Sequence, residues 1–259
     1  MSIGLIVTLL LIGVVGALLS GMLGIGGAIV NYPMLLYVPV LFGVGHYTPH
    51  QVAGIVALQV LFATLSGVLA LLKNKVIHYG LVAHMGASIL IGSFVGAYGA
   101  KFLPGSSINV IYAVLATIAA VMMFIPKRGV EDIPLNEIQF NVFVAIVAAM
   151  VVGMAAGVVG AGGAFILVPI MLQVLKIPTR VTIASSLAIT FISSIGASVG
   201  KVMAGNIPYE AAIIVVIASV VIAPLGVWVG RQIHAKALRA VLAMLIVATT
   251  VKIWFGILA

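Results

Sequence analysis

The chain of 259 residues is 64% hydrophobic and only 6% charged, whereas an ordinary soluble domain is about 25% charged. Residues 1–72 contain no Asp, Glu, Lys or Arg, although about 20 consecutive apolar residues suffice to cross a bilayer. This composition excludes a soluble enzyme and a nucleic-acid-binding module, and the absence of cysteine excludes disulfides and thiolate metal sites. The net charge of +8 comes from single or paired basic residues between apolar runs, which is typical of membrane topology. We therefore predict a multi-pass, all-α protein of the cell (plasma) membrane.

Loop signals divide the chain into ten apolar segments. No positively charged region precedes the first of them, so we interpret it as a membrane segment and not as a cleaved signal. The longest polar stretch, 126–139, lies at the midpoint and predicts a cytoplasmic linker between a first membrane repeat (1–125) and a second (140–259). The expected segments are 3–20, 28–44, 50–72, 80–100, 107–125, 140–157, 164–175, 181–200, 210–230 and 240–258.

The two halves of the chain resemble each other in sequence. Many matches occur in the same order, separated only by small changes in loop length, which indicates an internal duplication. GMLGIGGA at 21–28 returns as GVVGAGGA at 157–164, with Pro33 matching Pro169 at the same offset of 136; Pro49, Leu58 and Gly67 match Pro178, Leu187 and Gly196 at 129; Tyr79, Gly96 and Lys101 match Tyr209, Gly226 and Arg231 at 130.

The basic residues indicate how the two repeats are oriented. If each repeat crosses the bilayer an odd number of times, nine of the 12 Lys and Arg residues gather on one face and three on the other. An even number of crossings divides them six and six. Because Lys and Arg are enriched on the cytoplasmic side, we favour inverted repeats with both termini outside. The segments that flank each glycine-rich run either cross fully or form a re-entrant pair, since both arrangements keep the odd number.

Each repeat carries the glycine motif G-x-x-G-x-G-G-A-x4-P. Four glycines in seven residues cannot sustain a helix, since each costs up to about 1 kcal/mol relative to alanine. In a bilayer, broken backbone is tolerated only inside protein or beside a wet cavity, and a helix that starts there offers N–H groups to an anion. Inverted repeats bring two such helix starts together near the midplane, although close helix packing also explains the glycines. The predicted backbone ligands of a small anion are Gly24, Gly26, Gly27, Gly160, Gly162 and Gly163.

Several side chains are candidates for the same site. Asn31 and Gln59 carry amides that can donate hydrogen bonds to an anion, and Thr190 belongs to a hydroxyl stripe on segment 181–200. Each of them is alternatively a polar contact between helices. Lys101 and Arg231, which match in the duplication, either attract anions to opposite ends of a path or lie at helix ends as snorkelling residues.

All four acidic residues lie at segment boundaries or in the linker, so no segment offers a buried carboxylate for a proton relay. Sodium coupling, anion exchange and uncoupled flux all stay open. The sequence also has no H-E-x-x-H, no G-x-S-x-G and no pair of acids within a segment. We therefore expect neither an enzyme nor a cofactor.

With its duplicated glycine motif, the chain resembles the TauE/SafE family of sulfite or organosulfonate exporters over nearly its whole length. The run T-I-A-S-S-L after Pro178 is similar to the family's G-T-S-L-type segment, and this similarity implicates Ser185 and Ser186 in substrate binding. The first half reads A-G-I-V-A-L at 53–58 without hydroxyls, so the two halves of the site are expected to differ. The resemblance implies the export of a small sulfur-containing anion such as sulfite or an organosulfonate. Together with the two glycine motifs, it leads us to expect a secondary transporter that works by alternating access around a midplane site.

Two other functions stay open at this stage. An anion channel would use the same fold with a continuous pore, and a membrane assembly subunit would use the glycines for packing only. The expected partners are a small anionic substrate and the lipid bilayer, with no nucleic acid. Seams of small residues, such as the one along 80–100, permit a homodimer without requiring it.

Overall fold

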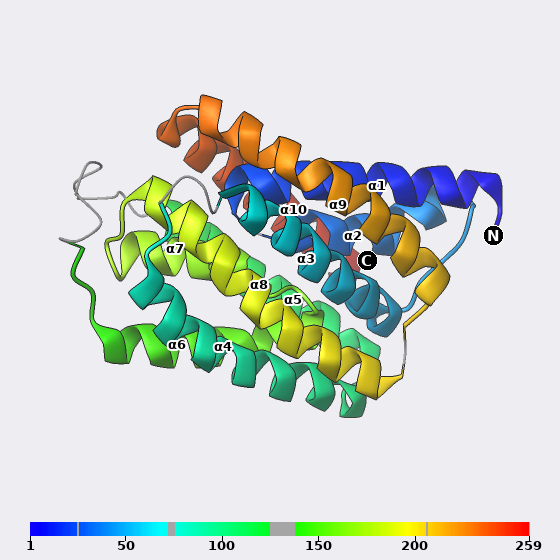
Figure 1. The fold of residues 1–259 in the computed structure, drawn as a ribbon. Coiled ribbons are helices and arrows are strands. Elements are labelled where there is room, and N and C mark those ends of the chain that lie inside the picture. Colours follow the sequence, from blue (N-terminus) through cyan, green and yellow to red (C-terminus); the bar gives the residue numbers. More distant parts are fainter. Residues whose placement is uncertain (25, 72–75, 125–137, 206, 259) are drawn as a thin grey trace.

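The computed structural model describes residues 1–24, 26–71, 76–124, 138–205 and 207–258, and these residues form an all-helical molecule (Figure 1). Within these ranges ten α-helices coincide with the ten apolar segments expected from the sequence. Residues 126–137 of the predicted linker lie outside the described residues, so the division into domains stays a prediction. The helices are α1 (Ile3–Leu23), α2 (Ala28–Leu41), α3 (Pro49–Leu71), α4 (Tyr79–Gly99), the short 3-10 helix η2 (Ala100–Phe102), α5 (Gly105–Phe124), α6 (Val142–Val159), α7 (Ala164–Gln173), α8 (Thr179–Ala204), α9 (Tyr209–Gln232) and α10 (Ala235–Leu258).

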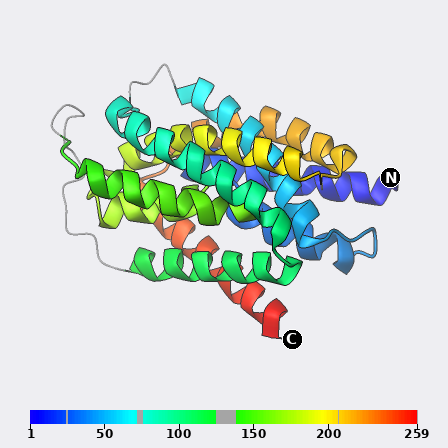
Figure 2. The same cartoon turned by 90° about the horizontal axis from the view of Figure 1, so that it is seen from below.

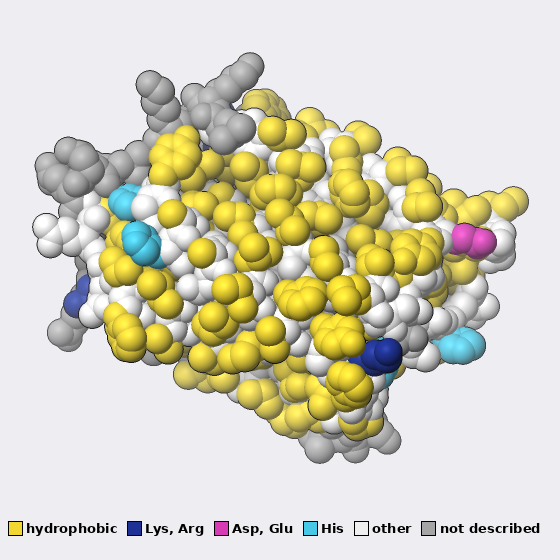
Figure 3. Space-filling model, turned by 60° about the horizontal axis from the view of Figure 1, so that its bottom comes forward, with side chains coloured by type: hydrophobic (Ala, Val, Ile, Leu, Met, Phe, Trp, Pro, Cys, Tyr) yellow, Lys and Arg dark blue, Asp and Glu magenta, His cyan; other side chains and the backbone are white. Residues whose placement is uncertain are grey.

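Within the described ranges seven helices are long and apolar enough to cross a bilayer: α1, α3, α4 together with η2, α5, α6, α8 and α9. Helices α2 and α7 are apolar but shorter, with 14 and 10 residues. Large apolar side chains such as Phe143 and Trp228 point outward, which water would disfavour and lipid accommodates. On the face in Figure 3, apolar side chains cover the middle, and the charged and histidine side chains lie toward the two ends. The all-helical membrane fold expected from the composition is confirmed.

The bundle has two ends, which we name the terminus end and the linker end. At the terminus end, Gly4 in the first turn of α1 lies against Val44, and the His50 Nε2 atom lies 3.1 Å from the carbonyl oxygen of Leu103. At the linker end, the backbone N–H of His78 donates to Ser185 Oγ at 3.0 Å. The His78 ring also lies 5.6 Å from the ring of Phe140, just before α6. Figure 2 shows both chain termini toward one side of the bundle, and the end of α5 and the start of α6 on the other side.

The helices that flank each glycine motif form returning pairs. Helix α1 runs away from the terminus end and α2 comes back to it, since Val44 follows α2 directly. Helix α6 begins at the linker end, and α7 leads within a few residues into α8, whose first turns also lie there. Helices α2 and α7 have 14 and 10 residues, fewer than the about 20 that a full crossing needs, so their lengths favour a re-entrant pair at each motif.

Glycines let helices from the two halves of the chain approach at backbone distance. Helix α1 packs along α9, and α4 packs between α6 and α8. Gly226 of α9 meets the carbonyl oxygen of Leu18 in α1, and Gly96 of α4 meets that of Met154 in α6. These two contacts are equivalent, because the glycines lie 130 positions apart and their partners 136. The first helix of each half therefore packs on the fourth helix of the other half.

The α4–α6 seam makes a stability prediction. A methyl group on Gly96 would collide with the Met154 backbone, whereas one on Gly99 meets nothing within 4 Å, and Gly99 is helical. We expect Gly96→Ala to destabilise the fold by about 1–3 kcal/mol through overpacking, and Gly99→Ala to stabilise it by about 0.5–1 kcal/mol. Thermal unfolding in detergent, followed by tryptophan fluorescence, measures both. Equal melting temperatures for the two variants would contradict the close backbone contact of α4 with α6 at Gly96.

Candidate anion site at the glycine motifs

The two glycine motifs break their helices in the same way. Helices α1 and α6 end at Gly24 (φ 68°) and Gly160 (φ 76°), in the left-handed region that favours glycine. Helices α2 and α7 begin after Gly27 (φ 74°) and Gly163 (φ 78°), neither of which makes a side-chain cap bond. The first N–H groups of a helix have no partner within that helix. Each motif thus presents an uncapped helix start, as the sequence predicts.

The two helix starts face one point between α3 and α8. A Cβ atom added to Gly26 would lie 2.9 Å from Thr190 Cγ2 and 3.0 Å from Val60 Cγ1. The same atom on Gly162 would lie 2.8 Å and 3.1 Å from these two methyl groups. Thr190 lies about halfway along α8. The structure therefore brings the two glycine motifs together, midway between the two ends of the bundle.

Hydroxyl groups of α8 hold the first motif in place. Ser186 Oγ donates to the carbonyl oxygen of Gly24 at 2.9 Å, and Thr190 Oγ1 donates to that of Ser186 at 2.6 Å. Gly160 lies against the carbonyl oxygen of Ala53 in α3 as Gly24 lies against that of Ile183 in α8. The α3 residue that corresponds to Ser186, however, is Val56, which has no hydroxyl. The contacts of the two motifs therefore differ, in line with the absence of hydroxyl side chains from 53–58.

The remaining predicted residues lie around this point in different settings. Asn31, in the first turn of α2, is fully buried against Gly16, and neither of its amide atoms has a hydrogen-bond partner. Gln59 Nε2 donates to Ser219 Oγ of α9 at 3.2 Å, while its Oε1 atom has no partner. Ser185 Oγ accepts the His78 N–H and so fixes the start of α4, away from Gly24. A ligand role for each of them stays a prediction.

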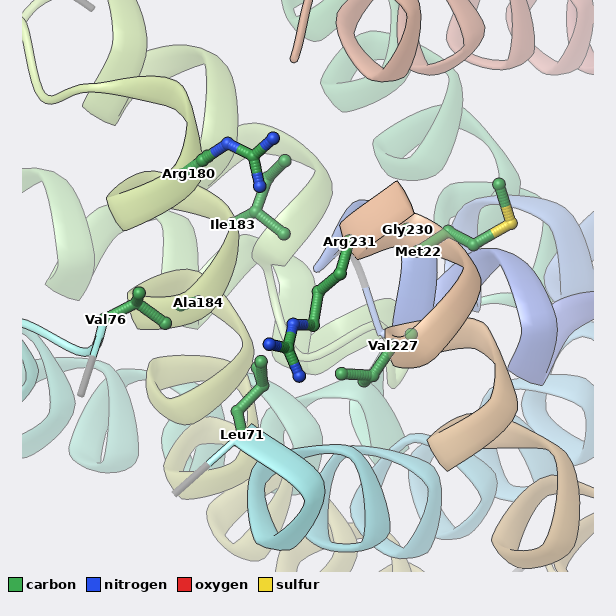
Figure 4. A pocket seen from close by; sticks show the side chains of 10 residues that line it. Met22, Leu71, Val76, Arg180, Ile183, Ala184, Val227, Gly230 and Arg231 are labelled. Carbon is green, nitrogen blue, oxygen red and sulfur yellow. The ribbon is translucent and has the colours of Figure 1, made fainter. Parts of the chain in front are cut away.

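A pocket of about 210 Å³ opens at the linker end, beside the first motif (Figure 4). Its wall includes Gly21 of α1 and Ile183 of α8, whose carbonyl oxygen lies against Gly24. Arg180 and Arg231 also line it. The sequence pointed to Arg231 and missed Arg180. The sequence does hold one signal for Arg180: it lies at the start of a predicted helix, where a positive charge opposes the helix dipole. The other lining residues are Met22, Leu71, Val76, Ala184, Val227 and Gly230.

At the terminus end the equivalent position is filled by Lys201. This side chain is only 4% exposed, and its Nζ atom donates to the carbonyl oxygen of Val158 at 2.6 Å. Lys201 stands 130 positions after Leu71 and Val158 stands 136 after Met22, and both counterparts line the pocket. In the sequence, Lys201 is only one of the 12 basic residues that indicate topology, because nothing in its neighbours predicts burial.

In the described ranges, no three His, Asp or Glu side chains lie close enough together to hold a metal ion. Three of the four acidic residues belong to 126–137, outside those ranges. The candidate site combines backbone N–H groups and hydroxyls at the motifs with two arginines in the adjacent pocket, and such groups can bind anions.

A bundle with seven candidate membrane spans, whose two helix breaks meet near its centre, defines a polytopic membrane protein. The model of the family "Sulfite exporter TauE/SafE" matches residues 9–253, so the chain belongs to that family of membrane transporters. The resemblance inferred from the duplicated glycine motif is confirmed.

Curated relatives extend over almost the whole chain. The probable membrane transporter protein YunE of Bacillus subtilis is 25% identical over 262 residues, which cover 93% of this chain and 94% of YunE. A probable membrane transporter protein of Methanocaldococcus jannaschii is 22% identical and covers 92% of this chain and 91% of its own. One of Xylella fastidiosa is 29% identical over 187 residues, 71% of this chain and 68% of its own. No solved structure matches the chain.

The bond between α8 and the first motif is open to a direct test. Ser186→Ala removes the hydroxyl that satisfies the Gly24 carbonyl and leaves that group buried without its partner. We expect a loss of about 1–3 kcal/mol in the free energy of unfolding. Ser106→Ala, at an exposed position on α5, should stay within about 0.5 kcal/mol of the parent protein. Denaturant or thermal unfolding in detergent compares the pair, and equal stability would show that the Ser186 hydroxyl does not hold the motif.

Proposed function

We propose that the protein is a secondary transporter that exports a small sulfur-containing anion, such as sulfite or an organosulfonate. The observation that carries this proposal is the meeting of two uncapped helix starts at Thr190 and Val60. The N–H groups of a helix start and its dipole both favour a negative charge. Two of them facing one point attract an anion without a charged side chain at the midplane.

The proposed ligands are the backbone of Gly26, Gly27, Gly162 and Gly163, with Thr190 beside them. Close methyl groups around Gly26 and Gly162 leave no room for a side chain at either position. Asn31 offers an unsatisfied buried amide in the first turn of α2, and an unpaired buried polar group costs about 1–3 kcal/mol. A bound anion that reaches this amide would recover that cost, which supports a role for Asn31 in binding.

We infer further that the two halves are inverted repeats that work by alternating access. The α1–α2 pair returns to the terminus end and the α6–α7 pair to the linker end, which is what inversion predicts. The pocket at the linker end and the Lys201 side chain at the equivalent position of the terminus end correspond to a state open on one side. Release of the Lys201–Val158 bond, together with closure of the pocket, gives the opposite state.

We assign the linker end to the cytoplasm and both termini to the outside. Lys176, Arg180 and Arg231 are exposed at the linker end, in keeping with the enrichment of basic residues on the cytoplasmic side. Substrate therefore enters the pocket from the cytoplasm, as export requires.

Ligand-dependent stability tests the anion site. Sulfite at 100 times its Kd should add about 2.7 kcal/mol to the apparent stability of the purified protein, and taurine, phosphate and chloride serve as comparison ligands. We expect Gly26→Ala and Gly162→Ala to abolish this gain. Gly205→Ala is the matched control, because Gly205 has φ +81° with nothing within 4 Å and so carries the same backbone strain away from the motifs.

Two outcomes would count against the proposal. If Gly26→Ala and Gly162→Ala still bind sulfite as the parent protein does, the glycine site is wrong. If no sulfur-containing anion stabilises the parent protein, the substrate class is wrong, and a role in membrane assembly gains weight.

Cysteine accessibility separates alternating access from a channel. The chain has no cysteine, so single variants report without background. Ile183→Cys lies in the pocket wall, and Ala53→Cys is its buried counterpart at the terminus end, because Gly160 meets Ala53 as Gly24 meets Ile183. During sulfite transport, labelling of Ala53→Cys by a membrane-impermeant maleimide outside the cell should rise severalfold, while labelling of Ile183→Cys from the cytoplasmic side falls. Labelling of both positions that is independent of substrate would indicate a continuous pore.

A further inference from the structure

Two arginines from different helices line the pocket beside the first glycine motif. Arg180 is the second residue of α8, and Arg231 is the last residue but one of α9. Figure 4 shows their side chains entering the space between α8 and α9 from the two sides. A guanidinium group presents several N–H donors in a planar fork that fits two oxygen atoms of one oxyanion. Among the residues that the structure describes, the rest of the wall is small or apolar, so these two arginines are its charged groups.

The position of Arg180 is unfavourable for the isolated helix. A positive charge in the first turn opposes the helix dipole, and α8 has no acidic residue in its first turn to compensate. Glu210 is the one acidic residue in the described ranges, and it begins α9, whereas Arg231 lies at the other end of that helix. The described part of the chain thus offers these two guanidinium groups no carboxylate.

The terminus end lacks such a pair. In the structure Gly24 meets Ile183 and Gly160 meets Ala53, so α3 and α8 correspond at an offset of 130, one more than the sequence matches of 49–67 give. The counterpart of Arg180 in this register is His50, whose Nε2 atom lies 3.3 Å from the Ala100 carbonyl oxygen and 3.1 Å from that of Leu103. The counterpart of Arg231 is Lys101, which is exposed on η2. The equivalent of the pocket is occupied by Lys201. A paired arginine site is therefore a property of the linker end alone in the described structure.

We propose that Arg180 and Arg231 form a loading site for a small oxyanion, which captures a sulfite-type or sulfonate group before it moves to the glycine motifs. This inference rests on the proposed transport function. The carbonyl oxygen of Ile183 lies against Gly24, so the same wall connects the arginines to the first motif. Because the pair exists at one end only, the transporter binds its substrate more tightly from the linker end than from the terminus end.

Sulfite binding to the full chain in phosphatidylcholine nanodiscs tests the loading site. We expect Arg180→Gln and Arg231→Gln each to raise the Kd for sulfite about tenfold, and the double variant to raise it further. Arg180→Lys and Arg231→Lys keep the charge but lose the fork, so their Kd values should lie between. Lys176→Gln removes an exposed charge at the same end that does not line the pocket, and it should leave the Kd unchanged.

Transport assays supply the second readout. In proteoliposomes, the arginine variants should raise the half-saturating sulfite concentration at the linker side about tenfold, with little change at the terminus side. Lys101→Gln should leave the linker-side value unchanged. An equal rise on both sides would mean that the arginines act through the overall fold, and it would overturn the loading site.

Anionic lipid headgroups share this chemistry, so the binding series is repeated with phosphatidylglycerol in the nanodiscs. If the Arg180→Gln and Arg231→Gln effects on sulfite persist in phosphatidylcholine alone, the pocket takes the free anion. If the variants bind sulfite like the parent in phosphatidylcholine and differ only in phosphatidylglycerol, the pair binds lipid and the loading site is wrong. If the parent protein itself fails to bind or transport sulfite, the proposed function fails first, which is a distinguishable result.

Discussion

Unpaired backbone inside a bilayer is the constraint on which this architecture depends. Each glycine motif interrupts a helix in the middle of an apolar bundle, where lipid offers no hydrogen bonds. The molecule meets the constraint by covering each motif with a helix from the other half: α8 covers Gly24, and α3 covers Gly160. The same interlocking of the two halves accounts for the close packing of α1 on α9 and of α4 on α6, because only glycine lets these backbones approach. The breaks and the interlocked halves are therefore two aspects of one solution.

The helices and the breaks could be predicted from the sequence because their causes are local. Long apolar runs must form helices in lipid, and four glycines within seven residues cannot continue one. The returning course of α2 and α7 could not be predicted, since neither the apolar pattern nor the charge count distinguishes a re-entrant pair from two full crossings. That course is set by long-range contacts, such as that of Val44 with the first turn of α1.

For the side chains of the site, too, the sequence predicts local features but not long-range contacts. Ser185 and Ser186 are adjacent, identical and both implicated by the family resemblance, yet one holds the start of α4 and the other holds Gly24. Successive residues of a helix point about 100° apart, so the neighbours on each side decide their roles. The burial of Lys201 and the pocket position of Arg180 depend likewise on helices distant in sequence. The sequence therefore predicts the central glycines, whose effect is local, but not these outer groups, whose positions depend on long-range packing.

In the proposed transport cycle, the inequality of the two ends would give the duplicated fold a direction. Two equivalent repeats would make the two one-sided states mirror each other, with equal affinity for substrate on either side. Here Lys201 occupies one end and two arginines line the other. A ligand shifts a conformational equilibrium only by its difference in affinity for the two states. Charged groups placed at one end supply such a difference, so the unequal outer residues, rather than the shared glycine motifs, are what can set the preference of the transporter for one side of the membrane.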